Sequence, residues 1–461
     1  MSEAYRIEKL GPATITSPIH LADKPGDLLA DFVRDDARVL ADLEYRKVKR
    51  YLDNGQEPPS FEVAGPRKKI FFDGARINAG IVTCGGNCPG LNNVIRGLTM
   101  TLYHGYGVQN IYGFRYGYAG LNPEYNYPVI SLDPSTVRDI HNQGGTILGS
   151  SRGPQDPDIV VDTLEKMGIS ILFVIGGDGT FRGGLDIHEA VKRRGVDIGV
   201  IGIPKTIDND IPLVDHTFGF ETAVSEAANA IRAAYVEASA VDGGIGLVKL
   251  MGRHSGFIAA NAALAVRNVN LVLVPEVPFD LEGANGLMAY MDARFKAKKS
   301  TVIVVAEGAG QGFVRKSEKD ASGNAKLGDI GLFLKERISS KFQGKYPFAL
   351  KYIDPSYIIR SMPANAMDSI FCGYLAQAAA HAGMSGRTGM AVGRSHRVFT
   401  HIPFESLVSD RKTVDPEGAL WLSVLESTGQ PFYLTDKPPK KLSRLSYYPC
   451  GGTELEGLRK Q

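Results

Sequence analysis

Short, continuous runs of Val, Ile and Leu that end in glycine constrain this chain more than any other feature. AGIVTCGG, ISILFVIGGDGT and DIGVIGIPKT occur between Asn78 and Phe220, with helical segments between them, and GIGLVKLMGR, NLVLVPEVP and TVIVVAEG occur later in the chain. Continuous apolar runs that alternate with helices indicate parallel strands buried on both faces, with ligands held at the carboxyl ends of the strands. We therefore predict an α/β fold with two lobes and mainly parallel sheets.

The chain has 461 residues, which is too long for one ordinary core. Apolar positions at helical spacing between residues 26 and 55 predict an N-terminal helical extension. One interpretation returns the segment GMAVGR to the first lobe as a strand, and the stretch after Thr413 is expected to form a surface tail. The expected division is 1–77 for the extension, 78–220 for the first α/β lobe, 221–384 for the second α/β lobe, with a long helix over 221–239 joining the two lobes, and 385–461 for the return segment and tail.

Composition and charge exclude several classes of partner. The formal net charge is +2 and the basic residues do not form a stripe, which argues against nucleic acid. The chain contains no apolar run of about eighteen residues, so we expect no membrane span. Four cysteines are too few for a disulfide framework, and Cys84 with Cys88 lacks a second Cys/His pair for structural zinc. A cytoplasmic protein is expected.

Two glycine-rich clusters follow predicted strands. CGGNCPGLNN, beginning at Cys84, precedes a helix and would present backbone N–H groups to an anion. The second cluster, IGGDGT, places Asp178 among glycines. An acid there would repel phosphates unless a cation lay between them, so Asp178 is interpreted as a Mg²⁺ ligand; the alternative is an aspartate that only forms a turn. No dinucleotide fingerprint or Walker A sequence is present, which disfavours a nicotinamide-dependent dehydrogenase.

The segment IPKTIDNDIP crowds charged and polar side chains behind a third strand. Asp208 and Asp210 lie together with Lys205, Thr206 and Asn209. Like charges at this spacing are unfavourable unless a substrate or metal compensates for them. A hydroxyl that attacks a phosphate needs a proton acceptor, and either Asp208 or Asp210 would serve.

Six motifs in this order resemble the phosphofructokinase family: GGNCPGLNN, GGTILGSSRG, GGDGT, PKTIDND, MGRHSG and VPE. The resemblance covers about Asn78 to Gly393. It implies two Rossmann-like lobes with the active site in the cleft between them. It also implies Mg²⁺-dependent transfer of a phosphoryl group to the 1-hydroxyl of fructose 6-phosphate in glycolysis, by a homo-oligomer, commonly a tetramer, under allosteric control.

The resemblance also implies roles for individual residues. Asp208 would be the catalytic base, assisted by Thr206 and Arg253, and Asp178 and Asp210 would hold Mg²⁺. The nucleotide would contact Gly85, Gly86, Tyr118, Arg152, Gly153, Gly177, Asp178, Gly179, Thr180 and Lys205. Fructose 6-phosphate would contact Thr206, Ile207, Asp208, Met251, Gly252, Arg253, Glu276, Glu307, Lys351, Tyr357 and Arg360.

The phosphoryl donor depends on two positions. Pyrophosphate-dependent members have an aspartate after the metal ligand, whereas this chain has Gly179, as ATP-dependent members do; Lys205 favours pyrophosphate. The pairing resembles the plant and trypanosomatid ATP-dependent branch, so ATP is the expected donor and pyrophosphate the alternative. The same branch accounts for Tyr357, where the familiar bacterial enzymes have histidine, and for Gly244, where they have an arginine for which Lys249 would compensate.

Two other kinds of protein remain as alternatives. A non-catalytic sugar-phosphate sensor would not need the complete set of Asp178, Thr206, Asp208 and Arg253. A diacylglycerol kinase or NAD kinase would share only the GGDGT element, and would leave PKTIDND and MGR unexplained.

Overall fold

The structure, a computed structural model, describes residues 5–22, 26–297, 299–314 and 326–437. These residues form two compact units. The described residues of unit 1 lie within Met1–Ala223 and Tyr357–Lys412, and those of unit 2 lie within Val224–Asp320, Ala325–Ser356 and Thr413–Gln461. The chain returns to unit 1 at Tyr357, ahead of the return segment expected from residue 385.

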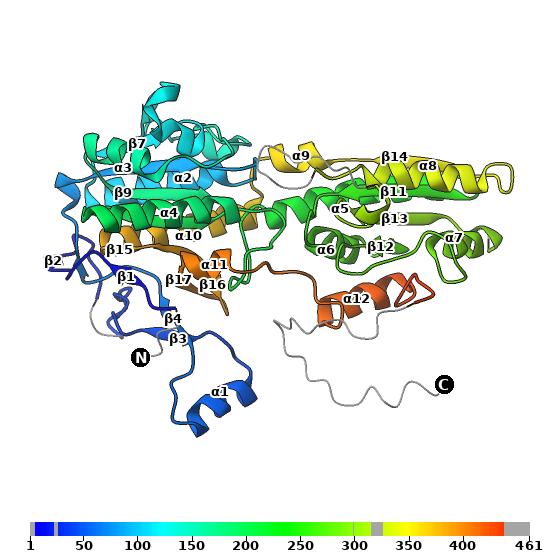
Figure 1. The fold of residues 1–461 in the computed structure, drawn as a ribbon, viewed down its shortest axis with the longest axis horizontal. Helices are drawn as coiled ribbons and strands as arrows, with labels where there is room; N and C mark the ends of the chain where they lie inside the picture. The colour runs from blue at the N-terminus through cyan, green and yellow to red at the C-terminus, as the bar shows by residue number, and fades with distance from the viewer. Residues whose placement is uncertain (1–4, 23–25, 298, 315–325, 438–461) are drawn as a thin grey trace. The chain divides into compact units, whose positions relative to one another are not determined.

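Unit 1 contains a nine-stranded sheet in the order β3-β4-β17-β16-β10-β9-β6-β7-β8 (Figure 1). The five strands from β16 to β7 are parallel, while the remaining neighbours pair antiparallel at the two edges. This arrangement confirms the α/β class. The strands are β3 (Arg38–Leu40), β4 (Ser60–Val63), β6 (Asn78–Thr83), β7 (Asn110–Phe114), β8 (Val129–Ser131), β9 (Ile169–Gly176), β10 (Gly199–Pro204), β16 (Met390–Ser395) and β17 (Val398–Pro403).

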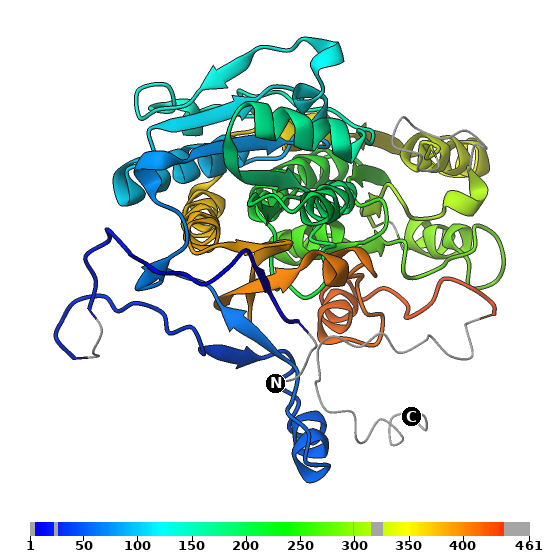
Figure 2. The same cartoon turned by 60° about the vertical axis from the view of Figure 1, so that its left-hand side comes forward.

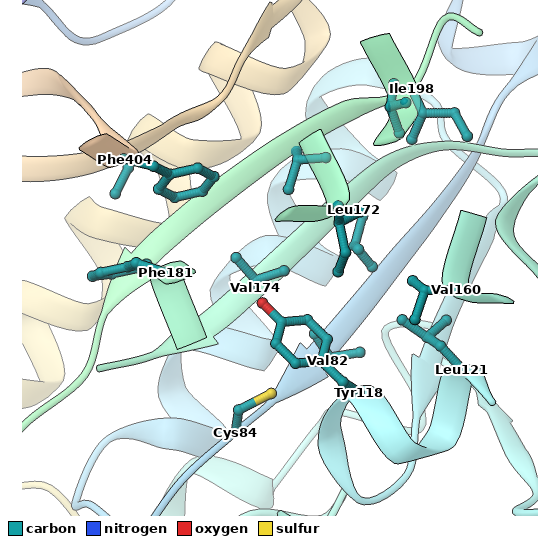
Figure 3. Packing of buried hydrophobic residues seen from close by; sticks show 14 of the residues in the cluster. Val82, Cys84, Tyr118, Leu121, Val160, Leu172, Val174, Phe181, Ile198 and Phe404 are labelled. Atoms are coloured by element: carbon teal, nitrogen blue, oxygen red, sulfur yellow. The ribbon is translucent and has the colours of Figure 1, made fainter. Parts of the chain in front are cut away.

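Helices cover both faces of this sheet. Alternate residues of β9 point to opposite faces, so each face presents apolar side chains to the helices that pack on it. Leu172 and Val174 belong to a buried cluster with Phe181 of α4, and Figure 3 shows these side chains with Phe404. Ile171 and Phe173 instead lie against Gly383 of α10. The helices are α2 (Leu91–Met100), α3 (Pro157–Lys166), α4 (Asp178–Arg194), α9 (Ser356–Ser361), α10 (Ala366–Met384) and α11 (Phe404–Val408), with α5 spanning Phe220–Ser239.

The N-terminal extension contains less helix than its periodicity predicts. Within residues 26–55 the structure has one helix, α1 (Tyr45–Asp53), which buries none of its side chains and projects beyond β3 and β4 in Figures 1 and 2. Arg38–Leu40 forms β3 instead, because it pairs with β4. Pairing with a distant strand can override a local helical pattern. Two small sheets complete this part of unit 1, β1 (Glu8–Lys9) with β15 (Arg387–Thr388) and β2 (Ile15–Thr16) with β5 (Lys69–Ile70).

Unit 2 contains a four-stranded parallel sheet in the order β12-β13-β11-β14. Its apolar cluster includes Leu247, Ile303 and Phe342. The strands are β11 (Gly244–Leu250), β12 (Leu271–Leu273), β13 (Thr301–Ala306) and β14 (Ala349–Ile353), and the helices are α6 (Phe257–Val266), α7 (Leu287–Lys296), α8 (Ile330–Phe342) and α12 (Ala419–Thr428). The three runs read from the sequence as later strands are β11, β12 and β13.

The sequence predicts a surface tail and no membrane span. The tail after residue 437, with Cys450, lies outside the described residues. Among the helices that the structure does describe, none combines the length and the apolar character that crossing a membrane would require.

Candidate active site

Unit 1 contains a cavity of about 810 Å³ at the carboxyl ends of β6, β9 and β10. Loops that follow neighbouring parallel strands meet at one edge of a sheet, and this geometry brings distant motifs together. Ile207 and Asp208 adjoin the lining residues in the chain but do not line the cavity themselves. The predicted site residues that line it are Gly85, Tyr118, Arg152, Gly153, Gly177, Asp178, Gly179, Thr180, Lys205, Thr206 and Asp210.

The turn after β6 lies beside three cationic side chains. The ammonium of Lys205 donates to the carbonyl of Gly86 at 2.8 Å. A Cβ atom on Gly86 would lie 3.3 Å from a guanidinium nitrogen of Arg360 and 3.6 Å from one of Arg152. Burial lowers the pKa of Lys205, and the two arginines lower it further. A bound anion would relieve this repulsion, so the turn suits a phosphate.

The N-terminus of α4 forms a second part of the same wall. Gly177 caps the helix, and the helix begins at Asp178. The first backbone N–H groups of a helix have no partner within it, and the helix dipole favours an anion there. A Cβ atom at Gly179 would meet no atom within 4 Å, so a ligand can approach the backbone at this point.

Asp178 and Asp210 share one cation. Arg411 Nη2 lies 3.0 Å from Asp178 Oδ2, and Arg411 Nη1 lies 3.6 Å from Asp210 Oδ2. Arg182 also contacts Asp178, at 3.1 Å. The guanidinium of Arg411 marks a position where both carboxylates face a single positive charge. Nowhere in the described part of the chain do three or more His, Cys, Asp or Glu side chains gather as a metal cage. Mg²⁺ commonly uses one or two carboxylates, with waters and substrate phosphates completing its shell, so the pair fits Mg²⁺.

The loop after β10 is held by its own hydrogen bonds. The backbone N–H of Asp208 donates to Thr206 Oγ1 at 3.1 Å, and the hydroxyl of Thr217 donates to the carbonyl of Thr206 at 2.7 Å. Asn209 adopts a φ of +53°, which is uncommon for a residue other than glycine. Its side chain accepts a hydrogen bond from the backbone N–H of Thr217 at 3.2 Å. The surroundings therefore hold a conformation that the chain alone would disfavour.

Most of the predicted residues of unit 2 lie at the corresponding edge of its own sheet, whereas Lys351 lies within β14, opposite Gly246 of β11. Met251–Arg253 follow β11, Glu276 follows β12 and Glu307 follows β13. The backbone N–H of Gly308 donates to the carbonyl of Gly252 at 3.0 Å, which joins two of these turns.

Glu276 carries a buried carboxylate in this group. Its Oε1 accepts hydrogen bonds from the backbone N–H groups of Gly256 and Val414, at 2.9 and 2.8 Å. Oε2 is buried and has no partner among the described residues. Burial raises the pKa of this carboxyl. A ligand hydroxyl would satisfy the second oxygen.

Comparison with known proteins decides the family. The phosphofructokinase family matches residues 78–383, which is more than half of the chain. The chain belongs to the phosphofructokinase family. It is 50% identical over 436 residues to the ATP-dependent 6-phosphofructokinase of Amycolatopsis methanolica, covering 92% of this chain and 95% of that protein. It is also 50% identical over 372 residues to the ATP-dependent 6-phosphofructokinase of Trypanosoma brucei brucei, covering 80% and 76%.

Solved structures of phosphofructokinases share the fold. A pyrophosphate-dependent phosphofructokinase from Marinobacter aquaeolei aligns with a TM-score of 0.63 at 18% identity, covering 81% of this chain and 100% of that chain. The two Rossmann-like lobes implied by the sequence motifs are therefore confirmed, and so is the resemblance to a family branch that includes trypanosomatid enzymes.

Three other residues named from the phosphofructokinase motifs have well-defined surroundings. Tyr118 is buried, and its hydroxyl donates to the carbonyl of Thr180 at 2.7 Å. Figure 3 shows its ring among core side chains near Cys84 and Val82, so it forms a fixed wall of the cavity. Lys351, in unit 2, pairs with Glu237 at 3.7 Å. Tyr357, in unit 1, is 77% exposed, and the guanidinium of Arg360 lies 5.1 Å from the centre of its ring.

Lys249, the expected replacement for the arginine of the bacterial phosphofructokinases, already forms ion pairs with two carboxylates. Its ammonium lies 2.8 Å from Asp354 and 3.0 Å from Asp329. Burial opposes its charge, but the hydrogen bonds that the ammonium donates to these carboxylates raise its pKa above the ordinary value. Its charge is therefore engaged within unit 2.

The phosphofructokinase motifs did not identify three basic residues that shape the site, Arg182, Arg411 and Lys412. The ammonium of Lys412 donates to Asn209 Oδ1 at 3.1 Å and to the carbonyl of Val214 at 3.0 Å. Its backbone N–H donates to the carbonyl of Asp210 at 3.0 Å, and burial lowers its pKa to about 8. Arg411 and Lys412 lie far from the motifs in sequence, and their only sequence signal is a pair of adjacent basic residues.

Proposed function

We propose that this protein is an ATP-dependent 6-phosphofructokinase, which converts fructose 6-phosphate to fructose 1,6-bisphosphate in glycolysis. The cavity of unit 1 carries the proposal. It combines a helix N-terminus and basic side chains, which suit phosphates, with a pair of carboxylates that suit a divalent cation. The relatives at 50% identity that are named ATP-dependent 6-phosphofructokinase support the same activity.

The open space at Gly179 supports ATP as the donor. A carboxylate at this position, about 4 Å from the α-phosphate, would cost roughly 4 kcal/mol at an effective dielectric constant near 20. No side chain crowds the position, so the nucleotide's extra phosphate meets no opposing charge from it. Lys205 is the feature that favours the alternative, a pyrophosphate-dependent fructose 6-phosphate 1-phosphotransferase.

In the proposed reaction, one residue accepts the substrate's proton, two carboxylates bind the metal, and Arg253 and Thr206 contact the reacting groups. Asp208 accepts the proton of the 1-hydroxyl, whose oxygen forms a bond to the γ-phosphorus as the bond to ADP breaks. Asp178 and Asp210 would hold Mg²⁺, which would supply positive charge beside the donor phosphates. Arg253 stabilises charge on the phosphoryl group, and Thr206 orients the acceptor.

The remaining contacts belong to the same proposal. The sugar phosphate contacts Ile207, Met251, Gly252, Glu276, Glu307, Lys351, Tyr357 and Arg360. The nucleotide contacts the glycine loops of unit 1, including Gly86. A homo-oligomeric assembly, either a tetramer or a dimer, allosteric control and a cytoplasmic location complete the proposal.

A donor comparison tests this function. The purified protein is assayed with fructose 6-phosphate and Mg²⁺, with either ATP or pyrophosphate as the donor, and fructose 1,6-bisphosphate is measured directly. We expect fructose 1,6-bisphosphate to form with ATP and little or none with pyrophosphate, because no side-chain charge at position 179 opposes the α-phosphate of ATP. A preference for pyrophosphate would favour the alternative, and no product with either donor would overturn the proposal.

A further inference from the structure

We propose that Arg411 is a displaceable counter-ion for the metal-binding carboxylates, which leaves them for the donor phosphates when the metal and the donor enter together. This inference rests on the proposed function, because it concerns the same cavity. It gives a role to a residue outside the motifs of the family and explains why a cation lies at the position expected for the metal.

Arg411 contacts both carboxylates with different nitrogens of one guanidinium. The distances are 3.0 Å to Asp178 and 3.6 Å to Asp210. A guanidinium and a metal ion cannot occupy this position together, because each would displace the other and their like charges repel. The arginine must therefore move before a metal ion can bind between these carboxylates.

The neighbouring residue allows the side chain to move while the backbone stays in place. Lys412 is buried and is bonded to Asn209, Val214 and Asp215 at 3.0 to 3.2 Å. The backbone N–H of Lys412 also bonds to the carbonyl of Asp210. The side chain of Arg411, in contrast, is 37% exposed and lines the cavity. Lys412 therefore fixes the backbone, while the side chain of Arg411 can change its rotamer.

Phosphate oxygens offer Arg411 a second binding place in the same cavity. Guanidinium groups form charge-assisted bonds to phosphates, often with two nitrogens. The cavity that Arg411 lines also contains the N-terminus of α4 and Arg152, where donor phosphates are proposed to lie. The metal alone must compete with Arg411, whereas a metal–donor complex supplies the arginine with new partners. The structure thus favours joint binding of metal and donor over binding of the metal alone.

Binding of Mn²⁺ without nucleotide tests the inference. Free Mn²⁺ is followed by its electron paramagnetic resonance signal during titration of the wild type, Arg411→Gln and Arg411→Lys. We expect Arg411→Gln to bind Mn²⁺ about three- to tenfold more tightly than the wild type, because the cation that contacts both carboxylates is gone. Arg411→Lys keeps one positive charge and should stay within about twofold of the wild type.

Arg193→Gln is the matched control. Arg193 lies on α4, pairs with Asp158 at 2.7 Å and is outside the cavity lining, so its loss changes the net charge equally. We expect unchanged Mn²⁺ affinity in this variant. An equal gain in Arg193→Gln would show a general charge effect and overturn the inference. So would an Arg411→Gln variant that binds Mn²⁺ no more tightly than the wild type, or an Arg411→Lys variant as tight as Arg411→Gln.

A nucleotide titration supplies the second readout. Binding of Mg²⁺ with a non-hydrolysable ATP analogue should weaken about three- to tenfold in Arg411→Gln, the opposite direction to Mn²⁺ alone. A purely structural role would move both affinities in the same direction, and that result would also overturn the inference. Neither titration contains fructose 6-phosphate, so their outcome is independent of whether the wild type transfers a phosphoryl group to that sugar.

Discussion

The hydroxyl oxygen of Thr206 accepts a hydrogen bond from the backbone N–H of Asp208 at 3.1 Å. This bond closes a tight turn directly after β10, and the hydroxyl of Thr217 fastens the same turn through the carbonyl of Thr206. The turn sets the backbone from which Asp208 projects, so the proposed base does not depend on a flexible loop for its position. A substitution at Asp208 should therefore change its chemistry while the turn remains.

Asp208→Asn should lower kcat by roughly a hundredfold or more, because the hydroxyl proton of the substrate loses its acceptor. The amide has nearly the same shape, so binding of fructose 6-phosphate should change by only a few fold. Steady-state kinetics and direct binding of fructose 6-phosphate measure the two effects. Turnover close to that of the wild type would remove Asp208 from the role of base.

Gly179→Asp should abolish the use of ATP by adding a negative charge beside the donor phosphates. No atom lies within 4 Å of the new Cβ, so the substitution should not disturb the backbone. Gly373→Asp is the matched control, since Gly373 also has open space around it and does not line the cavity. We measure kcat/KM for ATP and for pyrophosphate in each protein. Full ATP turnover in Gly179→Asp would show that another position sets the donor.

Arg360→Ala should weaken binding of fructose 6-phosphate by about 1.5 to 3 kcal/mol, the range for hydrogen bonds to charged groups. Arg360 lies beside Gly86 and Arg152, which are assigned to the nucleotide. The test therefore separates a role in binding the sugar phosphate from a role in binding the nucleotide. Dissociation constants for the sugar phosphate and for the nucleotide are measured separately. Weakening confined to the nucleotide would assign Arg360 to the donor and contradict the substrate role.

The stability of unit 1 should decrease in mild acid, because His381 is buried. Burial, together with nearby Arg67 and His401, lowers its pKa from 6.5 to about 4. The unfolded chain therefore takes up the proton first, so this contribution to stability is fully present above pH 6.5 and is lost as the pH falls towards 4. The free energy of unfolding should fall by at most about 1.4 kcal/mol per pH unit for this group.

Urea unfolding of wild type and His381→Asn at a series of pH values measures the effect. The asparagine keeps a polar partner for the hydroxyl of Tyr106, which lies 2.7 Å from His381 Nδ1. We expect a shallower pH dependence in the variant between pH 6.5 and 4. Identical slopes would assign the acid sensitivity to other groups, such as His216 and His401, whose pKa values burial also lowers to about 4.

The elements and motifs that could be predicted from the sequence are those formed by residues that are contiguous in the chain. The apolar runs of β9, β10 and β11 lead directly into the motifs GGDGT, PKTIDND and MGR, so both the strands and their motifs could be read directly. The pairing of β3 with β4 and of β4 with β17 could not, because it depends on strands far apart in the chain. The contact of Arg411 with Asp178 and Asp210 could not be predicted for the same reason. A pair of adjacent basic residues does not indicate its contacts until the returning chain places Arg411 against Asp178.

The insertion of β16 beside β10 has a consequence for the newly made chain. β10 ends at Pro204, whereas its neighbour β16 begins at Met390, so the two strands leave the ribosome far apart in time. Until Met390 has been made, the edge of β10 that pairs with β16 in the complete chain has no partner strand for its backbone groups. Such edges pair readily with other chains. Chaperone contacts should therefore concentrate on nascent chains that have passed Pro204 but not yet reached Met390, and a stop codon between these points would produce an aggregating fragment instead of a smaller enzyme.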